Sequence, residues 1–301
     1  MTSKRHISSD ISSEQHVLIA GPTASGKSAL ALELATRQGG VIVNADALQV
    51  WSCWRVISAR PSAAEETIAP HRLYGHMDPG ADFSVGIWLD QVAGLLAGGE
   101  RLIIVGGTGM YLHALANGLA VIPPIPPEVR VAGNALMSRD DGLAEAIAAL
   151  DAQTRDRIDL RNPARVQRAW EVQQATGRGI LSWQAETGPP LIGPDQSERI
   201  VLTSHRDWLA DRIERRFHAM MDQGALDEVR AMLPQWDASA LWAKAIGAPE
   251  LVAHLRGETS LEEAVDRAII ATRQYAKGQR IFFRNRMRDW RAIAMDVDSD
   301  T

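Results

Sequence analysis

The segment from Gly21 to Ser28 reads GPTASGKS and fits the phosphate-loop pattern G-x-x-x-x-G-K-[ST] at every fixed position. A short apolar run, Val17–Ala20, precedes it, and a segment with helical spacing, Ser28–Gln38, follows it. In such a strand–loop–helix unit, backbone N–H groups, a lysine and the positive end of the helix all face an anion. The sequence therefore predicts phosphate binding, although the loop does not say which molecule carries the phosphate. The candidate phosphate-binding residues are Gly21, Thr23, Ala24, Ser25, Gly26, Lys27 and Ser28.

Three further apolar runs, Gly40–Val43, Leu102–Val105 and Ile200–Leu202, are short and rich in Val, Ile and Leu, which is typical of buried parallel strands. Between the first two, Ile87–Ala97 has helical spacing. Alternating strands and helices around a phosphate loop predict an α/β fold, a P-loop NTPase-like doubly wound parallel sheet.

Prolines and glycines divide the chain. The stretch VIPPIPPEVR and the stretch GPPLIGPDQ favour extended connections over helix or central strand, and the segment between them is mostly helical in pattern. We expect a polar tail at residues 1–15, an α/β core with C-terminal helices at 16–120 and 197–301, and an inserted helical domain at 121–196.

Composition narrows the function classes. The net charge of −5 gives no overall attraction to nucleic acid, so an RNA partner needs a local basic surface. No apolar run is long enough to span a bilayer, and the N-terminus lacks the apolar core of a signal peptide. With a single cysteine, Cys53, the sequence predicts a cytoplasmic protein with no membrane and no obligate protein partner.

Two sets of basic residues have helical spacing. They are Arg161, Arg165 and Arg168 in the insertion, and Arg273, Lys277, Arg280 and Arg284 near the C-terminus. Arg288 and Arg291 extend the second set if its helix is continuous. Such stripes suit a phosphate backbone, and the alternative is that each is a solvated helix face.

Asp46 is the acidic residue that the strand pattern places near the phosphate loop, because it follows the predicted strand VIVN. The other predicted strand, LIIV, is followed by glycines and Thr108 and by no acidic residue. Ser28 and Asp46 are therefore the candidate ligands of Mg²⁺. At this point a nucleotide or small-molecule kinase that uses ATP remains open.

Four longer stretches together resemble one family, the tRNA dimethylallyltransferases, also called tRNA isopentenyltransferases. They are GPTASGKSALALELA, NADALQVW…ARP, IIVGGTGMYLHAL and TRQYAKGQRIFFR. The stretches PHRL, RNPARVQRAWEV, RFHAMMDQGALDEV and IGAPEL follow in the family's order, so the likeness extends from residue 16 to residue 290.

The resemblance implies that a dimethylallyl group passes from its diphosphate to the exocyclic amine of the adenosine 3′ to the anticodon, so the partners are dimethylallyl diphosphate and the tRNA anticodon stem-loop. By matching positions, Asp46 is the general base, Thr108 and Arg216 contact the diphosphate, and Gln49 lies near the target base. The helical insertion and both basic sets would then bind the tRNA.

Several positions depart from the family pattern. Ala47 replaces Ser, Ile57 replaces Gly, Arg60 replaces Lys, and Gly278 replaces Arg. Gly278 weakens its helix by about 1 kcal/mol relative to Ala, which challenges the continuity of the second basic stripe. A kinase, or an RNA-binding protein without catalysis, therefore stays as an alternative.

Overall fold

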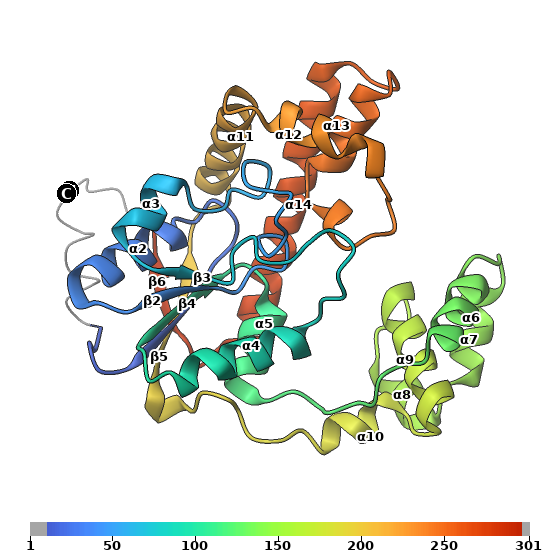
Figure 1. The fold of residues 1–301 in the computed structure, drawn as a ribbon. Coiled ribbons are helices and arrows are strands. Elements are labelled where there is room, and N and C mark those ends of the chain that lie inside the picture. Colours follow the sequence, from blue (N-terminus) through green and yellow to red (C-terminus); the bar gives the residue numbers. More distant parts are fainter. Residues whose placement is uncertain (1–10, 297–301) are drawn as a thin grey trace. The chain divides into compact units, whose positions relative to one another are not determined.

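The computed structural model describes residues 11–296 and divides the chain into two compact units, shown in Figure 1. The core unit runs to Ala116 and resumes at Leu191, and the insertion unit spans Asn117–Pro190. The sequence pattern predicts the insertion at 121–196. Its C-terminal limit falls earlier because the Leu191 N–H donates to the Leu115 carbonyl (3.1 Å), and Ile192 is buried in the core.

The core unit contains one parallel six-stranded sheet in the order β3-β2-β4-β1-β5-β6. The strands are β1 His16–Ala20, β2 Val41–Asn44, β3 His71–Arg72, β4 Leu102–Gly106, β5 Ser197–Thr203 and β6 Arg291–Ala294. In this register Ile19 pairs with both Val105 and Ile200, so β1 lies between two parallel neighbours. The predicted α/β fold is confirmed. The edge strands β3 and β6 were not predicted, because they are short and partly exposed.

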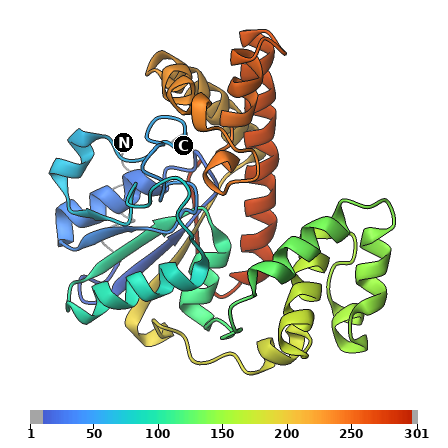
Figure 2. The same ribbon diagram turned by 45° about the vertical axis from the view of Figure 1, so that its right-hand side comes forward.

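Side chains alternate between the two faces of the sheet. Val17 and Ile19 pack with Leu30 and Leu34 of α2 (Lys27–Gln38), whereas Leu18 joins the larger cluster on the other face. Figure 2 shows the sheet and the helices that pack on it from a second angle. The larger cluster includes residues of α4 Val85–Ala97, α5 Gly109–Asn117, α11 Arg206–Asp222, α12 Ala225–Met232, α13 Ala248–Leu255 and α14 Leu261–Arg286. Shorter helices in this unit are α3 Ala63–Ile68, η1 Pro194–Gln196, η2 Leu233–Gln235 and η3 Trp242–Lys244.

The last helix, α14, begins at a Ser260 cap, which accepts the Glu263 N–H, and continues through Gly278. The glycine therefore does not interrupt the second basic stripe. The stripe is shorter than its longest prediction, however, because α14 ends at Arg286. Arg288 lies beyond the helix and Arg291 belongs to β6.

The insertion unit is helical. It contains α6 Pro127–Met137, α7 Gly142–Ala149, α8 Ala152–Arg157, α9 Pro163–Thr176 and α10 Ile180–Ala185. A small core of Leu136, Ala146 and Val166 holds α6, α7 and α9 together. As predicted, Asn162 caps α9, since its Oδ1 accepts the Arg165 N–H (3.2 Å), and Pro163 follows at the first helical position.

The N-terminal segment differs from its prediction. Residues 1–10 of the expected tail lie outside the described residues, but Ile11 is buried against the α2 side of the sheet. Its carbonyl accepts a hydrogen bond from Gln38 Nε2 (3.0 Å), and Arg101 donates to the Ser12 carbonyl (2.9 Å). Residues 11 and 12 thus belong to the core.

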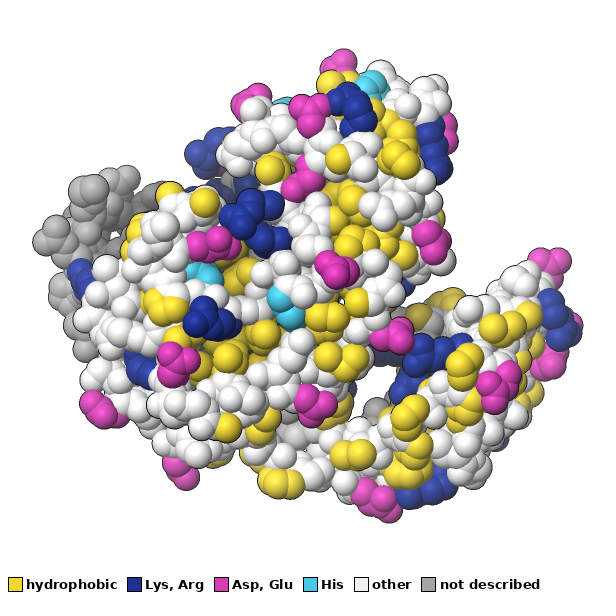
Figure 3. All heavy atoms as spheres, viewed as in Figure 1, with side chains coloured by type: hydrophobic (Ala, Val, Ile, Leu, Met, Phe, Trp, Pro, Cys, Tyr) yellow, Lys and Arg dark blue, Asp and Glu magenta, His cyan; other side chains and the backbone are white. Residues whose placement is uncertain are grey.

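Two surface features bear on the predicted partners. Among the described helices, none combines the length and apolar character needed to cross a membrane. On the face drawn in Figure 3, Lys and Arg side chains are scattered among acidic, polar and hydrophobic ones. That face carries no continuous basic field, in keeping with the net charge of −5.

Candidate active site

The phosphate loop connects β1 to α2. Gly26 has a φ of 93° and is the N-cap of α2, which explains the glycine, since a side chain there would strain the backbone. Ala24 also has a positive φ, 61°. The Ser25 N–H donates to the Pro22 carbonyl (3.2 Å), so the loop folds back on itself before the helix begins.

Lys27 stands at the start of α2, and its Nζ donates to the Pro22 carbonyl (3.4 Å). Burial lowers the pKa of Lys27 to about 8; the carboxylate of Asp46 opposes this shift, and the guanidinium of Arg216 adds to it. The ammonium is thus held in a poorly hydrated place beside one acid and one cation, where an anionic ligand would stabilise its charge.

Asp46 follows β2 and is fixed by its own turn. Its N–H donates to Asn44 Oδ1 (2.9 Å), and its Oδ1 accepts the Leu48 N–H (3.0 Å). Asn44, fully buried, also donates to the carbonyls of Asp46 and Leu73. The carboxylate therefore has a set direction at the carboxyl end of the sheet.

Six of the predicted site residues line one small cavity in the core unit. They are Thr23, Ala24, Lys27, Asp46, Gln49 and Arg216. Ile57, Phe217 and Ile246 add an apolar wall. One carboxylate, two cations and an apolar wall in one cavity can bind a ligand that has both an anionic and a hydrocarbon end. The remaining predicted loop residues are not part of this lining: Gly21 and Ser25 are buried, Gly26 is half-buried, and Ser28 is exposed in the first turn of α2.

Two arginines of α11 face the phosphate loop. Burial lowers the pKa of Arg216, Asp46 raises it, and Arg212 lowers it further. Arg212 was not predicted, yet its Nε donates to the Ala24 carbonyl (2.8 Å), and its guanidinium lies 4.6 Å from the Trp208 ring. The apolar stripe of Leu209, Ile213, Phe217 and Met220 is buried as predicted, so it fixes the orientation of both arginines.

Thr108 follows β4 and holds the turn after Asp46. Its Oγ1 accepts the Ala47 N–H (2.9 Å), and its own N–H donates to the Ala45 carbonyl (3.2 Å). From α14, the Tyr275 hydroxyl lies beside Thr108 and Gln279; burial and the carboxylate of Asp46 raise its pKa, and these two neighbours oppose the rise. Thr108 thus ties the base-bearing turn to α14, and its predicted contact with a diphosphate stays a prediction.

Gln49 uses both of its amide hydrogens inside the protein. Its Nε2 donates to the carbonyls of Ser58 and Ala59, at 2.9 Å each. The acceptor Oε1 is therefore what Gln49 can offer to a ligand in the cavity that it lines.

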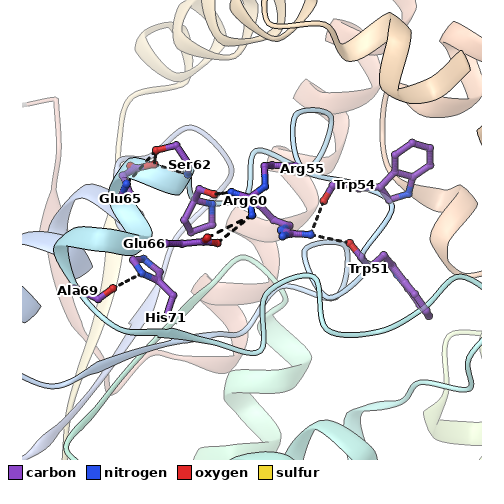
Figure 4. A network of polar contacts seen from close by, with 10 residues as sticks. Trp51, Trp54, Arg55, Arg60, Ser62, Glu65, Glu66, Ala69 and His71 are labelled. Atoms are coloured by element: carbon purple, nitrogen blue, oxygen red, sulfur yellow. Dashed lines mark hydrogen bonds and ion pairs between the residues drawn. The ribbon is translucent and has the colours of Figure 1, made fainter. Parts of the chain in front are cut away.

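The loop that carries Ile57 is braced from several directions. Glu228 on α12 accepts the backbone N–H groups of Val56 (3.0 Å) and Ile57 (2.8 Å). Figure 4 shows Arg60 donating to the carbonyls of Trp51 and Trp54, at 3.2 Å each, and Arg55 next to Glu66. Arg60, where the resemblance leads one to expect Lys, therefore braces the loop.

Ile57 itself is 5% exposed and has no positive φ. A backbone conformation that requires glycine is thus absent at this position, where the resemblance leads one to expect Gly. The isoleucine side chain fills space beside Phe217 and Gly247 and narrows the cavity on this side.

The C-terminal basic residues line a different cavity. Arg273, Lys277, Arg280 and Arg284 surround a groove of about 1070 Å³ between α11, α14 and the β5–β6 edge, with an apolar floor that includes Leu209 and Phe283. Because an α-helix turns once per 3.6 residues, Lys277 lies on roughly the opposite side of α14 from Tyr275 and Gln279. The structure therefore separates this basic set from the Asp46 cavity.

The basic set of the insertion unit lies at the start of α9. Arg161 and Arg165 are exposed, and Arg168 is half-buried, which lowers its pKa although Glu171 raises it. Val166 is fully buried, so the exposed arginines are on the solvent side of the helix as predicted. Whether they bind RNA stays a prediction.

A metal ion bound at this site would need oxygen ligands from the substrate as well as from the protein. Within residues 11–296, no group of three or more His, Cys, Asp or Glu side chains could hold a metal on its own. Mg²⁺ commonly binds through one or two protein oxygens together with substrate phosphates. Asp46 lines the cavity and Ser28 lies in the first turn of α2, so these two donors would suit that mode and would not make an all-protein site.

Comparisons with known proteins agree with this geometry. The family model described as IPP transferase matches residues 49–286, and the model described as isopentenyl transferase matches residues 14–78. A protein named tRNA dimethylallyltransferase from Paracoccus denitrificans is 63% identical over 98% of this chain and 99% of its own length. The chain belongs to the IPP transferase family.

Two further relatives of this IPP transferase chain support the assignment. A tRNA dimethylallyltransferase from Dinoroseobacter shibae is 59% identical over 95% of this chain and 96% of the relative. The crystal structure of the full-length tRNA isopentenylpyrophosphate transferase from Bacillus halodurans has a TM-score of 0.67, 31% identity, and covers 95% of this chain and 92% of that chain. The resemblance, the fold class and the assignment to the transferases are thus confirmed.

Proposed function

We propose that this chain transfers a dimethylallyl group from dimethylallyl diphosphate to the exocyclic amine of an adenosine in tRNA, next to the anticodon on its 3′ side. The observation that carries the proposal is the single cavity in which Lys27 and Arg216 face the carboxylate of Asp46 beside an apolar wall. The curated relatives are named for this activity on tRNA.

In the transfer, the adenine nitrogen forms a bond to the allylic carbon while the bond from that carbon to the diphosphate oxygen breaks. Negative charge collects on the departing diphosphate. Lys27, Arg216 and the loop N–H groups are fixed cations and donors at that place, so they stabilise the transition state more than the ground state.

The amine must lose a proton as it attacks. Asp46 is suited to accept it, because its Oδ1 is held by the Leu48 N–H and the direction of the carboxylate is set. A positioned base of this kind typically contributes about 10²–10⁴-fold to the rate. Gln49 Oε1 is the acceptor that can take the amine's other hydrogen and so select an amine over a carbonyl.

We propose that Ser28 and Asp46 hold Mg²⁺ together with the diphosphate. When bound, the ion would neutralise charge on the phosphate oxygens. Ser28 contributes a neutral hydroxyl, and the remaining positions would be filled by phosphate oxygens and water, because the described residues offer no cluster of three acidic, His or Cys side chains.

The RNA surfaces are proposals of the same kind. The exposed arginines of α9 and the outer face of α14 carry positive charge that suits the phosphates of an anticodon stem-loop. A location in the cytoplasm, where tRNA is modified, belongs to this proposal too.

Two incubations of the purified protein test the function. With labelled dimethylallyl diphosphate and unmodified tRNA, we expect label on one adenosine and release of one diphosphate per label. With ATP and nucleotide or small-molecule acceptors, we expect no phosphoryl transfer. Phosphoryl transfer without label on tRNA would establish the kinase alternative, and tRNA binding without either reaction would establish a non-catalytic RNA-binding protein.

A further inference from the structure

Gln279 is a buried polar side chain on α14 for which the chemistry above has no role. It is 6% exposed. Its Oε1 accepts the Thr23 N–H of the phosphate loop (2.9 Å), and its Nε2 donates to the Gly107 carbonyl after β4 (2.8 Å). One carboxamide therefore joins the phosphate loop to the end of the neighbouring strand β4, although these two segments are far apart in the sequence.

The surroundings of Gly107 show how closely the Gln279 side chain packs against this strand end. A Cβ added to Gly107 would lie 2.3 Å from Gln279 Nε2 and 3.2 Å from Asp46 Oδ2. Gln279 and the carboxylate of Asp46 thus crowd the same glycine, and the space that the glycine leaves is what lets the carboxamide reach its carbonyl.

Tyr275, one turn earlier on α14, extends the bridge. Its hydroxyl contacts Gln279 and Thr108, and Thr108 in turn accepts the Ala47 N–H beside Asp46. Tyr275 also lines the cavity with Lys27 and Asp46. Tyr275 therefore lies between the Gln279 bridge and the Thr108 side chain that holds the turn carrying the base.

We propose that Gln279 is a positioning residue that holds the phosphate loop in register with the Asp46 turn, so that leaving group and base face one reacting centre. The inference rests on the proposed function. Both ends of the carboxamide are paired, which is how a buried amide is normally retained. A displacement of about 1 Å between reacting groups can cost on the order of 10²-fold in rate.

The test compares three variants of the full chain. Gln279→Leu removes both hydrogen bonds, Gln279→Glu keeps the acceptor for Thr23 but loses the donor to Gly107, and Gln274→Leu is the matched control at an exposed position of the same helix. Single-turnover transfer is measured at saturating tRNA and donor, as a rate constant and as an amplitude.

For Gln279→Leu we expect the single-turnover rate constant to fall by about 10²-fold while the amplitude stays near one per folded enzyme. A merely structural role would lower the amplitude and leave the rate constant of the folded fraction unchanged. Gln274→Leu should change neither quantity.

Gln279→Glu adds a pH readout. When the introduced carboxyl group is protonated, it can donate to the Gly107 carbonyl again, so the ratio of the variant's rate constant to that of the wild type should rise as the pH falls. A wild-type rate constant in Gln279→Leu, or a ratio for Gln279→Glu that does not change with pH, overturns the inference.

A binding measurement separates this inference from the proposed function. If the wild type transfers no dimethylallyl group, the proposed function fails. Titration with inorganic diphosphate then still decides the role of Gln279, because a loosened phosphate loop should weaken diphosphate binding in Gln279→Leu and not in Gln274→Leu. Equal affinities for diphosphate in the wild type, Gln279→Leu and Gln274→Leu would overturn the inference.

Discussion

Polar side chains on the two sides of α14 meet different surroundings. On the side toward the phosphate loop, Gln279 is buried with both ends of its amide bonded, and Tyr275 contacts Thr108. On the outer side lie four exposed cations, Arg273, Lys277, Arg280 and Arg284. Arg273 pairs with Glu214 (2.6 Å).

The difference follows from what burial demands. A buried amide without partners costs on the order of 1–3 kcal/mol, so the inner side keeps an arrangement in which the oxygen and the nitrogen of the amide each have a partner. Exposed cations need no protein partner, because water solvates them, and they stay available to an anion. The inner side therefore suits catalysis, which depends on position, and the outer side suits binding that depends on charge and salt.

The largest effect should come from Asp46→Asn, which keeps the shape of the inner site and removes the proton acceptor. We expect kcat to fall by about 10²–10⁴-fold, while the affinity for tRNA in a filter-binding measurement stays the same. Asp90→Asn on the exposed side of α4 is the matched control. Turnover near the wild-type level in Asp46→Asn would place the base elsewhere and remove the catalytic distinction between the two sides.

The sequence predicts the ligand-facing residues of the inner side and the cations of the outer side of α14. The phosphate loop, its strand and helix, and Asp46 follow from local patterns, and the structure brings Lys27, Asp46 and Arg216 into one cavity. The outer cations could also be predicted, because their helical spacing is visible in the chain.

The bracing residues are harder to predict, because their partners are distant in sequence. Gln279 bonds to Thr23, Arg212 to Ala24, and Glu228 to the loop of Ile57. For Gln279 a signal existed: it falls on the buried stripe of α14 with Ala276 and Phe283, where a polar residue needs a partner. Glu228 gave no comparable signal, since a glutamate on an amphipathic helix is usually solvated.

The second effect concerns the outer side. Replacing Lys277, Arg280 and Arg284 together by Ala should weaken tRNA binding and reduce the slope of log affinity against log salt by about 2 to 3 if each contacts one phosphate. The single-turnover rate constant at saturating tRNA should not change. The control is Arg267→Ala, an exposed arginine of α14 that pairs with Glu263. An unchanged salt slope in the triple variant would show that this side binds no RNA.

A smaller effect should appear with pH on the inner side, because the pKa of Lys27 is lowered to about 8. A bound diphosphate restores the ammonium, so above pH 8 binding takes up a proton and affinity falls by at most about tenfold per pH unit. In the free protein, the unfolded chain binds more protons than the folded one between pH 8 and 10.5. The free energy of unfolding should therefore rise with pH through that window, because the cost of burying the Lys27 ammonium is relieved as it loses its proton.

Calorimetric titration with dimethylallyl diphosphate at pH 9, in buffers of different ionisation enthalpy, measures the proton uptake. Lys27→Arg is the control, because arginine stays protonated over this range. Equal uptake in both proteins would mean that the titrating group is not Lys27.

The smallest effect tests whether the two sides are independent. Gly278 lies between Lys277 and Gln279, is exposed, and an added Cβ would meet nothing within 4 Å. Gly278→Ala should stabilise the helix by about 1 kcal/mol and raise Tm by at most about 2–4 °C, because alanine loses less backbone entropy on folding. Thermal unfolding measures this, and the transfer rate constant should be unchanged. If Tm rises while the rate constant falls, stiffening α14 displaces Gln279, and the two sides would be coupled through the helix backbone.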